Sequence, residues 1–103
     1  MASYFVTVAA QGDIEDIVAT VADNNAEAAE VLEERIYEAF ELLAQMPGVG
    51  HHREDLTSLP VLFFPIKKTP YMAIYKDDSP TTIVRVVHGR RDIPSLLRDE
   101  SSV

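Results

Sequence analysis

One long amphipathic segment limits the folds open to this chain. Residues 26–46, AEAAEVLEERIYEAFELLAQM, place apolar side chains three and four positions apart, with glutamates between them. This period predicts a helix whose buried stripe consists of Ala28, Leu32, Ile36, Ala39, Phe40 and Leu43. Pro47 and Gly48 predict the end of the helix. Because the helix is apolar on one side only, a second layer of structure has to cover that side.

A shorter helix precedes it. In residues 12–23 the apolar side chains again fall on one helical stripe, at Ile14, Ile17, Val18 and Val21. Asp13 is the expected N-cap of this first helix, and Asn25 can cap the second. The link between the two helices is so short that they must run nearly antiparallel, as a helical hairpin.

The remaining apolar runs have the composition of strands. They are residues 3–10 before the helices, and residues 61–68, 71–76 and 81–88 after them. Pro65 places its strand at a sheet edge or in a bulge, and residues 93–99 predict a short terminal helix. The expected order is β-α-α-β-β-β, an α+β two-layer sandwich in which the hairpin packs on an antiparallel sheet. We expect one domain over residues 1–103, with the other sheet face left polar or covered by a partner.

Composition excludes several classes of protein. The chain has 103 residues, no cysteine and 47% hydrophobic residues, so a disulfide framework, a cysteine nucleophile and a disordered chain are excluded. No leader or membrane span is apparent, and we expect a soluble cytoplasmic protein. The adjacent His51 and His52 point in different directions without further ligands nearby, so we expect no metal site and no cofactor.

Charge is divided unevenly along the chain. Residues 1–46 hold ten acidic side chains against Arg35 alone, a net charge of −9, whereas residues 47–103 have a net charge of +1. The acidic half should repel nucleic acid, so we expect no direct sequence-specific DNA binding by the chain alone. The division suggests two faces with different partners, or simply a well-solvated pair of helices.

The acidic chain nevertheless gathers positive charge in residues 85–94, RVVHGRRDIP. Strict alternation along the last strand puts Ile83, Arg85 and Val87 on one face. Arg85 is expected to reach a glutamate of a helix. Gly89, adopting a positive φ, is expected to turn Arg90 and Arg91 to the rim of the sheet.

There the two guanidinium groups suit an anionic target, either phosphate or carboxylate. Lys67 and Lys68 could join them in one basic patch. The alternative is that Arg90 and Arg91 pair with Asp92, Asp99 or Glu100 on the surface.

Taken together, the helical hairpin of residues 12–55, the run YMAIYK (71–76) and IVRVVHGRRDI (83–93) resemble the ParE branch of the RelE/ParE toxin superfamily. MPGVG (46–50) and VRVVHGRRDI (84–93) are the most specific parts. The resemblance implies the toxin of a type II toxin–antitoxin system (a plasmid stabilisation protein), bound and neutralised by a cognate antitoxin. ParE relatives inhibit DNA gyrase, and RelE relatives cut messenger RNA on the ribosome.

One position weighs against RNA cleavage. In the nuclease branch an arginine stands three residues before a tyrosine, and here the corresponding residues are Met72 and Tyr75. A thioether cannot stabilise charge on a phosphate, and losing one such charge typically costs about 10²–10³ in rate. If the chain were a nuclease, His88, Arg90 and Arg91 would be the candidate catalytic residues.

The favoured hypothesis is therefore inhibition of a cellular target by protein–protein contact, with DNA gyrase as the candidate target. The target-binding residues are expected to be Lys67, Lys68, Arg90 and Arg91, and the groove between the hairpin and the sheet edge is expected to receive the antitoxin. A ribosome-dependent endonuclease is the alternative. A non-toxic binding or scaffold protein that associates with itself as a homodimer is a third hypothesis.

Overall fold

The computed structural model describes residues 3–98 and confirms an α+β fold with the expected order of helices and strands. The elements are β1 (Tyr4–Val6), α1 (Val8–Ala22), α2 (Ala26–Gln45), the 3₁₀ turn η1 (Pro47–Val49), β2 (Leu62–Pro65), β3 (Tyr71–Lys76), β4 (Thr81–His88) and α3 (Ile93–Arg98). Of the helices in this part of the chain, none combines the length and hydrophobicity that a membrane crossing requires.

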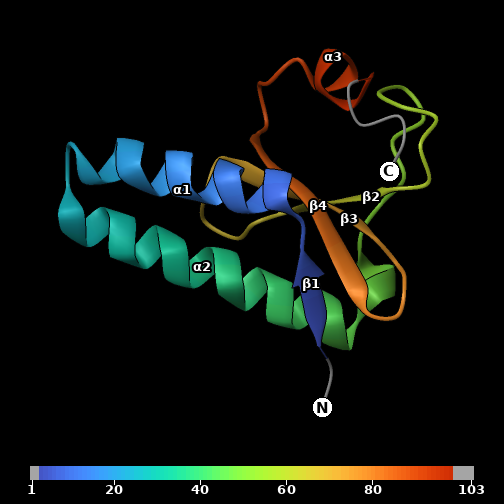
Figure 1. The fold of residues 1–103 in the computed structure, drawn as a ribbon, viewed down its shortest axis with the longest axis horizontal. Coiled ribbons are helices and arrows are strands. Elements are labelled where there is room, and N and C mark those ends of the chain that lie inside the picture. Colours follow the sequence, from blue (N-terminus) through green and yellow to red (C-terminus); the bar gives the residue numbers. More distant parts are fainter. Residues whose placement is uncertain (1–2, 99–103) are drawn as a thin grey trace.

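The helices α1 and α2 form the predicted antiparallel hairpin, and Figure 1 shows them side by side along one side of the molecule. Asn25 is the N-cap of α2, as predicted, because its Oδ1 accepts a hydrogen bond from the Ala28 amide at 3.0 Å. The predicted stripe of α2 is buried except at its first position. Ala29 is buried there and Ala28 is exposed.

The start of α1 differs from the prediction. Residues 3–10 were expected to be a strand with Asp13 as the N-cap, but β1 ends at Val6 and Thr7 caps the helix. The Thr7 hydroxyl accepts from the Ala10 amide at 3.1 Å and donates to the Val84 carbonyl of β4 at 2.8 Å. Thr7 therefore begins the helix and attaches it to the sheet at once.

The four strands form one sheet in the order β1-β4-β3-β2. β3 is antiparallel to β2 and β4, as predicted, whereas β1 is parallel to β4, so the sheet is mixed. The helical hairpin explains why β1 and β4 are parallel. It returns the chain to the end of the sheet where β1 begins. From there β2 runs in the direction of β1, β3 runs back, and β4 runs in the direction of β1 again. Pro65 lies on the edge strand β2, where a residue without an N–H group is tolerated.

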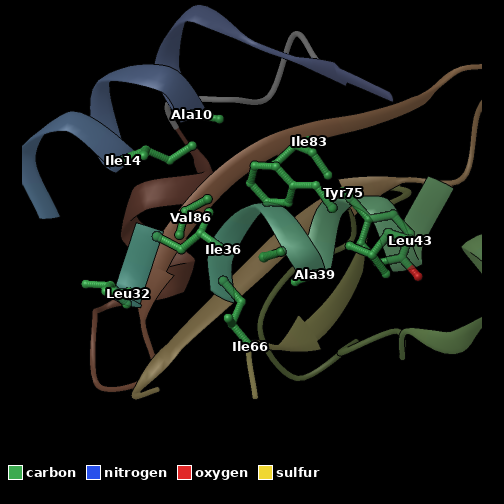
Figure 2. Packing of buried hydrophobic residues seen from close by; sticks show 12 residues of the cluster. Ala10, Ile14, Leu32, Ile36, Ala39, Leu43, Ile66, Tyr75, Ile83 and Val86 are labelled. Atoms are coloured by element: carbon green, nitrogen blue, oxygen red, sulfur yellow. The ribbon is translucent and has the colours of Figure 1, made fainter. Parts of the chain in front are cut away.

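Strict alternation along β4 was a wrong prediction, because the strand contains a bulge. Arg85 lies opposite Ile74 and Ile83 lies opposite Tyr75, so Val84 is an extra residue in the ladder. Ile83 and Val86 consequently face the helical hairpin, while Val84 and Val87 face the opposite side of the sheet. Figure 2 shows the hairpin-side cluster, with Ile83 and Val86 among the side chains of α1 and α2.

Asp13 has a different role from capping a helix. Its carboxylate accepts hydrogen bonds from Arg85 Nε at 2.7 Å, from Arg85 Nη2 at 2.8 Å and from the Val86 amide at 3.0 Å. The side chains of Asp13 and Arg85 are each only 14% exposed. Arg85 thus reaches a helix carboxylate, as predicted, although the acid is Asp13 of α1 and not a glutamate.

The second face of the sheet is covered by the chain itself. Helix α3 lies on this face together with the loop before β2, and the buried members of this second core are Val61, Phe63, Ile74, Val84, Val87, Ile93, Leu96 and Leu97. Figure 1 shows α3 apart from the α1–α2 hairpin. The expectation that this face would be polar or await a partner was wrong, because the predicted terminal helix supplies the apolar cover.

Tyr75 connects the sheet to the turn after α2. Its side chain is fully buried, and its hydroxyl donates to the Pro47 carbonyl at 2.6 Å and accepts from the Gly50 amide at 2.9 Å. A Cβ atom on Gly50 would collide with the tyrosine ring and hydroxyl. The MPGVG segment therefore owes its second glycine to the close approach of Tyr75.

Replacing Gly50 by alanine should destabilise the protein by about 1–3 kcal/mol, because the added methyl group overpacks a buried contact. Urea unfolding measures the change in the free energy of unfolding. Gly48→Ala is the matched control, because a Cβ atom at Gly48 meets no atom within 4 Å. Equal stability of the two variants would contradict this account.

Asp13→Ala should cost about 3 kcal/mol, because it leaves the largely buried Arg85 guanidinium and the Val86 amide without their carboxylate. Asp16→Ala on the same helix removes an exposed carboxylate and should change stability by no more than about 0.5 kcal/mol. Thermal unfolding of the two variants beside the parent protein provides the comparison, and a mild effect of Asp13→Ala would show that the contact is dispensable.

Candidate protein-binding surfaces

The basic residues that were predicted to bind the target lie in two turns. Lys67 and Lys68 form the turn between β2 and β3 and are both exposed. The Thr69 hydroxyl holds this turn, donating to the Ile66 carbonyl at 2.8 Å and accepting from the Tyr71 amide at 3.1 Å. Lys68 has a φ of 61° and therefore adopts the left-handed backbone conformation that favours glycine.

Arg90 and Arg91 lie in the turn after β4. The Arg91 amide donates to the His88 carbonyl at 2.9 Å, and the Arg90 amide donates to His88 Nδ1 at 3.0 Å. Gly89 does not have the positive φ that was predicted. The His88 ring and carbonyl shape the turn, so the arginines are exposed at the rim as expected but for a different reason.

The two turns meet at one end of the sheet. The Gly89 amide donates to the Pro70 carbonyl at 2.9 Å, and Tyr71 lies opposite His88 in the ladder. The same end of the sheet therefore carries four basic residues, Lys67, Lys68, Arg90 and Arg91. We call them the basic end.

Nothing in residues 3–98 neutralises the basic end through an ion pair, since the ion pairs there are Arg53–Asp55 and Arg85–Asp13. Of the acids predicted to pair with the arginines, Asp92 accepts a hydrogen bond from the Ser95 amide at the start of α3. Asp99 and Glu100 lie outside the described residues.

The candidate catalytic residues His88, Arg90 and Arg91 lie together in the turn after β4, whereas Met72 and Tyr75, at the positions of the nuclease pair, point to different sides of the sheet. Met72 packs with the α3-side core, whereas Tyr75 lies in the hairpin-side core with its hydroxyl engaged by Pro47 and Gly50. His88 is exposed at the end of β4, with its ring edge-on to Tyr71 at 5.5 Å between centroids. The positions that correspond to the nuclease pair therefore face opposite sides of the sheet.

Two hollows lie along α2 where it faces the β2–β3 hairpin. One, of about 380 Å³, lies beside Val31 and Tyr71, and the other, of about 190 Å³, lies beside Leu42 and Phe64. We call the two hollows together the α2–β2 groove. Arg35 lines both hollows, Lys68 lines the larger one and Lys67 the smaller one. The groove therefore begins at the basic end.

Arg35 was not identified from the sequence as a residue of a binding surface. It is the single base of residues 1–46, and it is half-buried and forms no ion pair with any residue in the described part of the chain. Its isolation among ten acidic residues was the signal in the sequence that could have drawn attention to it.

The two histidines after η1 close the outer edge of β2. The His51 backbone pairs with Phe63 through hydrogen bonds of 2.8 and 2.9 Å, and His52 Nδ1 lies 3.1 Å from the Val61 carbonyl. Nothing in the sequence indicates this role of the two histidines, because it depends on a loop that folds back on the strand.

The chain has a RelE/ParE-like α+β fold, in which a helical hairpin covers one face of a short mixed sheet. Residues 4–93 match the family described as the ParE toxin of the type II toxin–antitoxin system, parDE. The chain belongs to this family of ParE toxins.

A solved structure described as a chromosomal ParDE TA system from P. aeruginosa is similar to the chain, with a TM-score of 0.70 and 22% sequence identity. The alignment covers 85% of this chain and 96% of that one, and at this identity the likeness concerns the fold. No curated protein gives a significant match to the chain.

Burial of Tyr75 should make the fold sensitive to alkali. Burial raises the pKa of the Tyr75 hydroxyl above its ordinary value of 10.0, and burial together with Glu41 raises the pKa of Tyr4. In both cases the folded state keeps its proton longer than the unfolded state. The free energy of unfolding should therefore lose, above about pH 10, up to about 1.4 kcal/mol per pH unit for each such group.

Tyr75→Phe should have a shallower slope above pH 10 than the parent protein, because the contribution of Tyr75 is lost and that of Tyr4 remains. Urea unfolding at a series of pH values measures both slopes. Identical slopes would mean that the Tyr75 hydroxyl titrates equally in the folded and unfolded chain.

Proposed function

We propose that the chain is a toxin that inhibits its cellular target by protein–protein contact, without chemistry of its own, and that a cognate antitoxin neutralises it. The target that we propose is DNA gyrase. The observation that supports the proposal is that neither position of the nuclease pair offers a group to a phosphate, because Tyr75 is fully buried and Met72 packs with the core on the other side of the sheet. A hydroxyl held inside the core by Pro47 and Gly50 cannot reach a scissile phosphate.

The basic end is the proposed target-binding surface. Its four cations are exposed, lie in turns at one end of the sheet and form no ion pair within residues 3–98. Guanidinium groups bind carboxylates in a bidentate manner, and such contacts are common among the residues that dominate protein interfaces. An acidic patch on the target is therefore the expected counterpart.

The α2–β2 groove is the proposed antitoxin site. Val31 and Leu42 are 45% and 38% exposed, and they border the groove with Phe64. Lys67 and Lys68 belong to both the groove and the basic end. An antitoxin segment in the groove would cover half of the cations that the target needs, and neutralisation would follow from this overlap.

The purified chain should inhibit DNA supercoiling by gyrase, and the double variant Arg90→Ala/Arg91→Ala should need at least about tenfold more protein for the same inhibition, because two interface arginines are lost. Arg98→Ala, which removes an exposed cation from α3, should behave like the parent protein. A supercoiling assay with increasing amounts of each protein gives these values.

Other outcomes would favour the two alternatives. Full gyrase activity at saturating protein, together with codon-phased cuts in translated messages that vanish in Arg91→Ala, would favour the endonuclease. Normal growth of cells that express the chain without an antitoxin would favour a non-toxic binding protein.

A further inference from the structure

The turn that carries Arg90 and Arg91 is held by the hydrogen bonds of three consecutive amides. The Gly89 amide donates to the Pro70 carbonyl at 2.9 Å, and the Arg91 amide donates to the His88 carbonyl at 2.9 Å. The Arg90 amide donates to the His88 ring, at Nδ1, over 3.0 Å. His88 therefore accepts from both arginines, once through its carbonyl and once through its side chain.

These hydrogen bonds determine the shape of the turn. No residue from 89 to 92 has a positive φ, so a left-handed conformation does not bend the chain here. The segment is fixed on both sides, because His88 pairs with Tyr71 in the sheet and Asp92 accepts from the Ser95 amide at the start of α3. Residues 89–91 span the distance between these two points. A change in one of their hydrogen bonds therefore changes where the two guanidinium groups lie.

The His88 ring can accept from Arg90 in one protonation state only. An amide N–H always donates, so Nδ1 must be unprotonated, and the proton of the neutral ring is on Nε2. The imidazolium carries a proton on both nitrogens and would direct a second donor at the Arg90 amide. Histidine side chains change charge between about pH 5 and pH 8. The other two acceptors of the turn are carbonyls, so the Arg90 bond is the one that acid removes.

The surroundings of the ring offer no substitute for this bond. From β3 the Tyr71 ring lies edge-on to His88, with 5.5 Å between the centroids. Asp13 is bound to Arg85, and no carboxylate within residues 3–98 forms an ion pair with His88. The charged groups on the elements around the ring are Lys67 and Lys68 before β3, Arg90, Arg91 and Asp92 after β4, and Asp13, Glu15, Asp16 and Asp23 of α1 and its C-cap.

We propose that His88 is the positioning residue of the basic end. Its neutral ring holds Arg90 and Arg91 where they bind the target, and protonation of the ring releases them, so the chain binds its target more weakly in acid. The inference rests on the proposed function for the identity of the target, and it concerns a residue outside the four target-binding cations.

Two effects of protonation oppose each other. The imidazolium adds one positive charge to the basic end, which attracts a carboxylate, but a pair of exposed charges contributes little at physiological ionic strength. The released turn has to be ordered again when the target binds, and this cost falls on two arginines with long side chains. The loss of order is the larger effect, so acid weakens binding.

Two variants of His88 separate the acceptor from the ring. Asparagine accepts from the amide two residues further on through its side-chain carbonyl, and it does not titrate. Phenylalanine keeps an aromatic ring beside Tyr71 but offers no acceptor. In a supercoiling assay at about pH 8, where histidine is neutral, His88→Asn should inhibit gyrase like the parent protein. His88→Phe should need about fivefold more protein, which corresponds to one lost hydrogen bond.

The pH dependence is measured as a ratio. At each pH the amount of protein that gives half-inhibition is compared between the parent protein and His88→Asn, so that the pH dependence of gyrase itself cancels. At about pH 6 the parent protein should need about threefold more protein than His88→Asn. His52→Asn makes the same substitution at another exposed histidine, whose Nδ1 faces the Val61 carbonyl, and should keep the pH dependence of the parent protein.

A measurement without the target tests the turn by itself. The imidazole nitrogen chemical shifts of the purified chain should show an unprotonated Nδ1 of His88 at about pH 8. On acidification the Arg90 amide should lose protection against hydrogen exchange, while the Gly89 amide, which is bound to Pro70, should keep it. In His88→Asn both amides should keep their protection.

The outcomes separate this inference from the proposed function. If the parent protein does not inhibit gyrase at any pH, the proposed function fails and the effect on the target with it, whereas protection of the Arg90 amide still decides the role of His88 in the turn. If the parent protein inhibits gyrase but His88→Phe inhibits as well as His88→Asn, or if acid strengthens the inhibition, the inference alone is overturned. A protonated Nδ1 at about pH 8 would overturn it as well.

Discussion

The contact of Asp13 with Arg85 and the Val86 amide arises from the shortness of β1. That strand has three residues, and the chain enters α1 directly after it, so the edge of β4 beyond Ile83 has no strand beside it. Thr7 and Asp13 take the place of that strand, one bonding to the Val84 carbonyl and the other to the Val86 amide. In doing so they fix where α1 lies on the sheet. Because α2 is antiparallel to α1, its position over the sheet follows, and with it the groove between α2 and β2.

The same contact explains which parts of the fold could be predicted from sequence. The stripes of α1 and α2, the capping by Asn25 and the three later strands depend on local patterns, and the prediction of each was close to the structure. The start of α1 depends on contacts between residues more than 70 positions apart, and the faces of β4 depend on a bulge in its pairing with β3. The β-branched residues around Thr7 are typical of a strand, although threonine is also a favourable N-cap, and the bond to the Val84 carbonyl adds a contact that local sequence does not reveal. A bulge at Val84 likewise leaves no mark in an uninterrupted β-branched run.

Prediction of the binding surfaces was limited in the same way. The four cations of the basic end could be identified because they are adjacent in pairs within an acidic chain. That they share one end of the sheet depends on the β3–β4 register, which the sequence did not determine. Arg85 is separated from Arg90 by only four residues, yet Asp13 binds it, so proximity in sequence was a poor guide to membership of the basic end. The role of Arg35 could not be inferred from α2 alone, since the six glutamates of this helix offer many ion-pair partners and the structure uses none of them.

The distribution of charge favours proteins over nucleic acids as partners of the basic end. The net charge is −8, and the acidic side chains are concentrated in the two helices that lie over one face of the sheet. At physiological ionic strength screening acts over about 8 Å, so a small target group that approaches the basic end is affected mainly by the four nearby cations. A nucleic acid duplex carries charge along its whole length and would also approach the glutamates of α2. A carboxylate patch that is limited to the footprint of the basic end gains the attraction without this repulsion. The acidic helices would then disfavour the binding of extended polyanions, which agrees with the proposed inhibition by protein–protein contact.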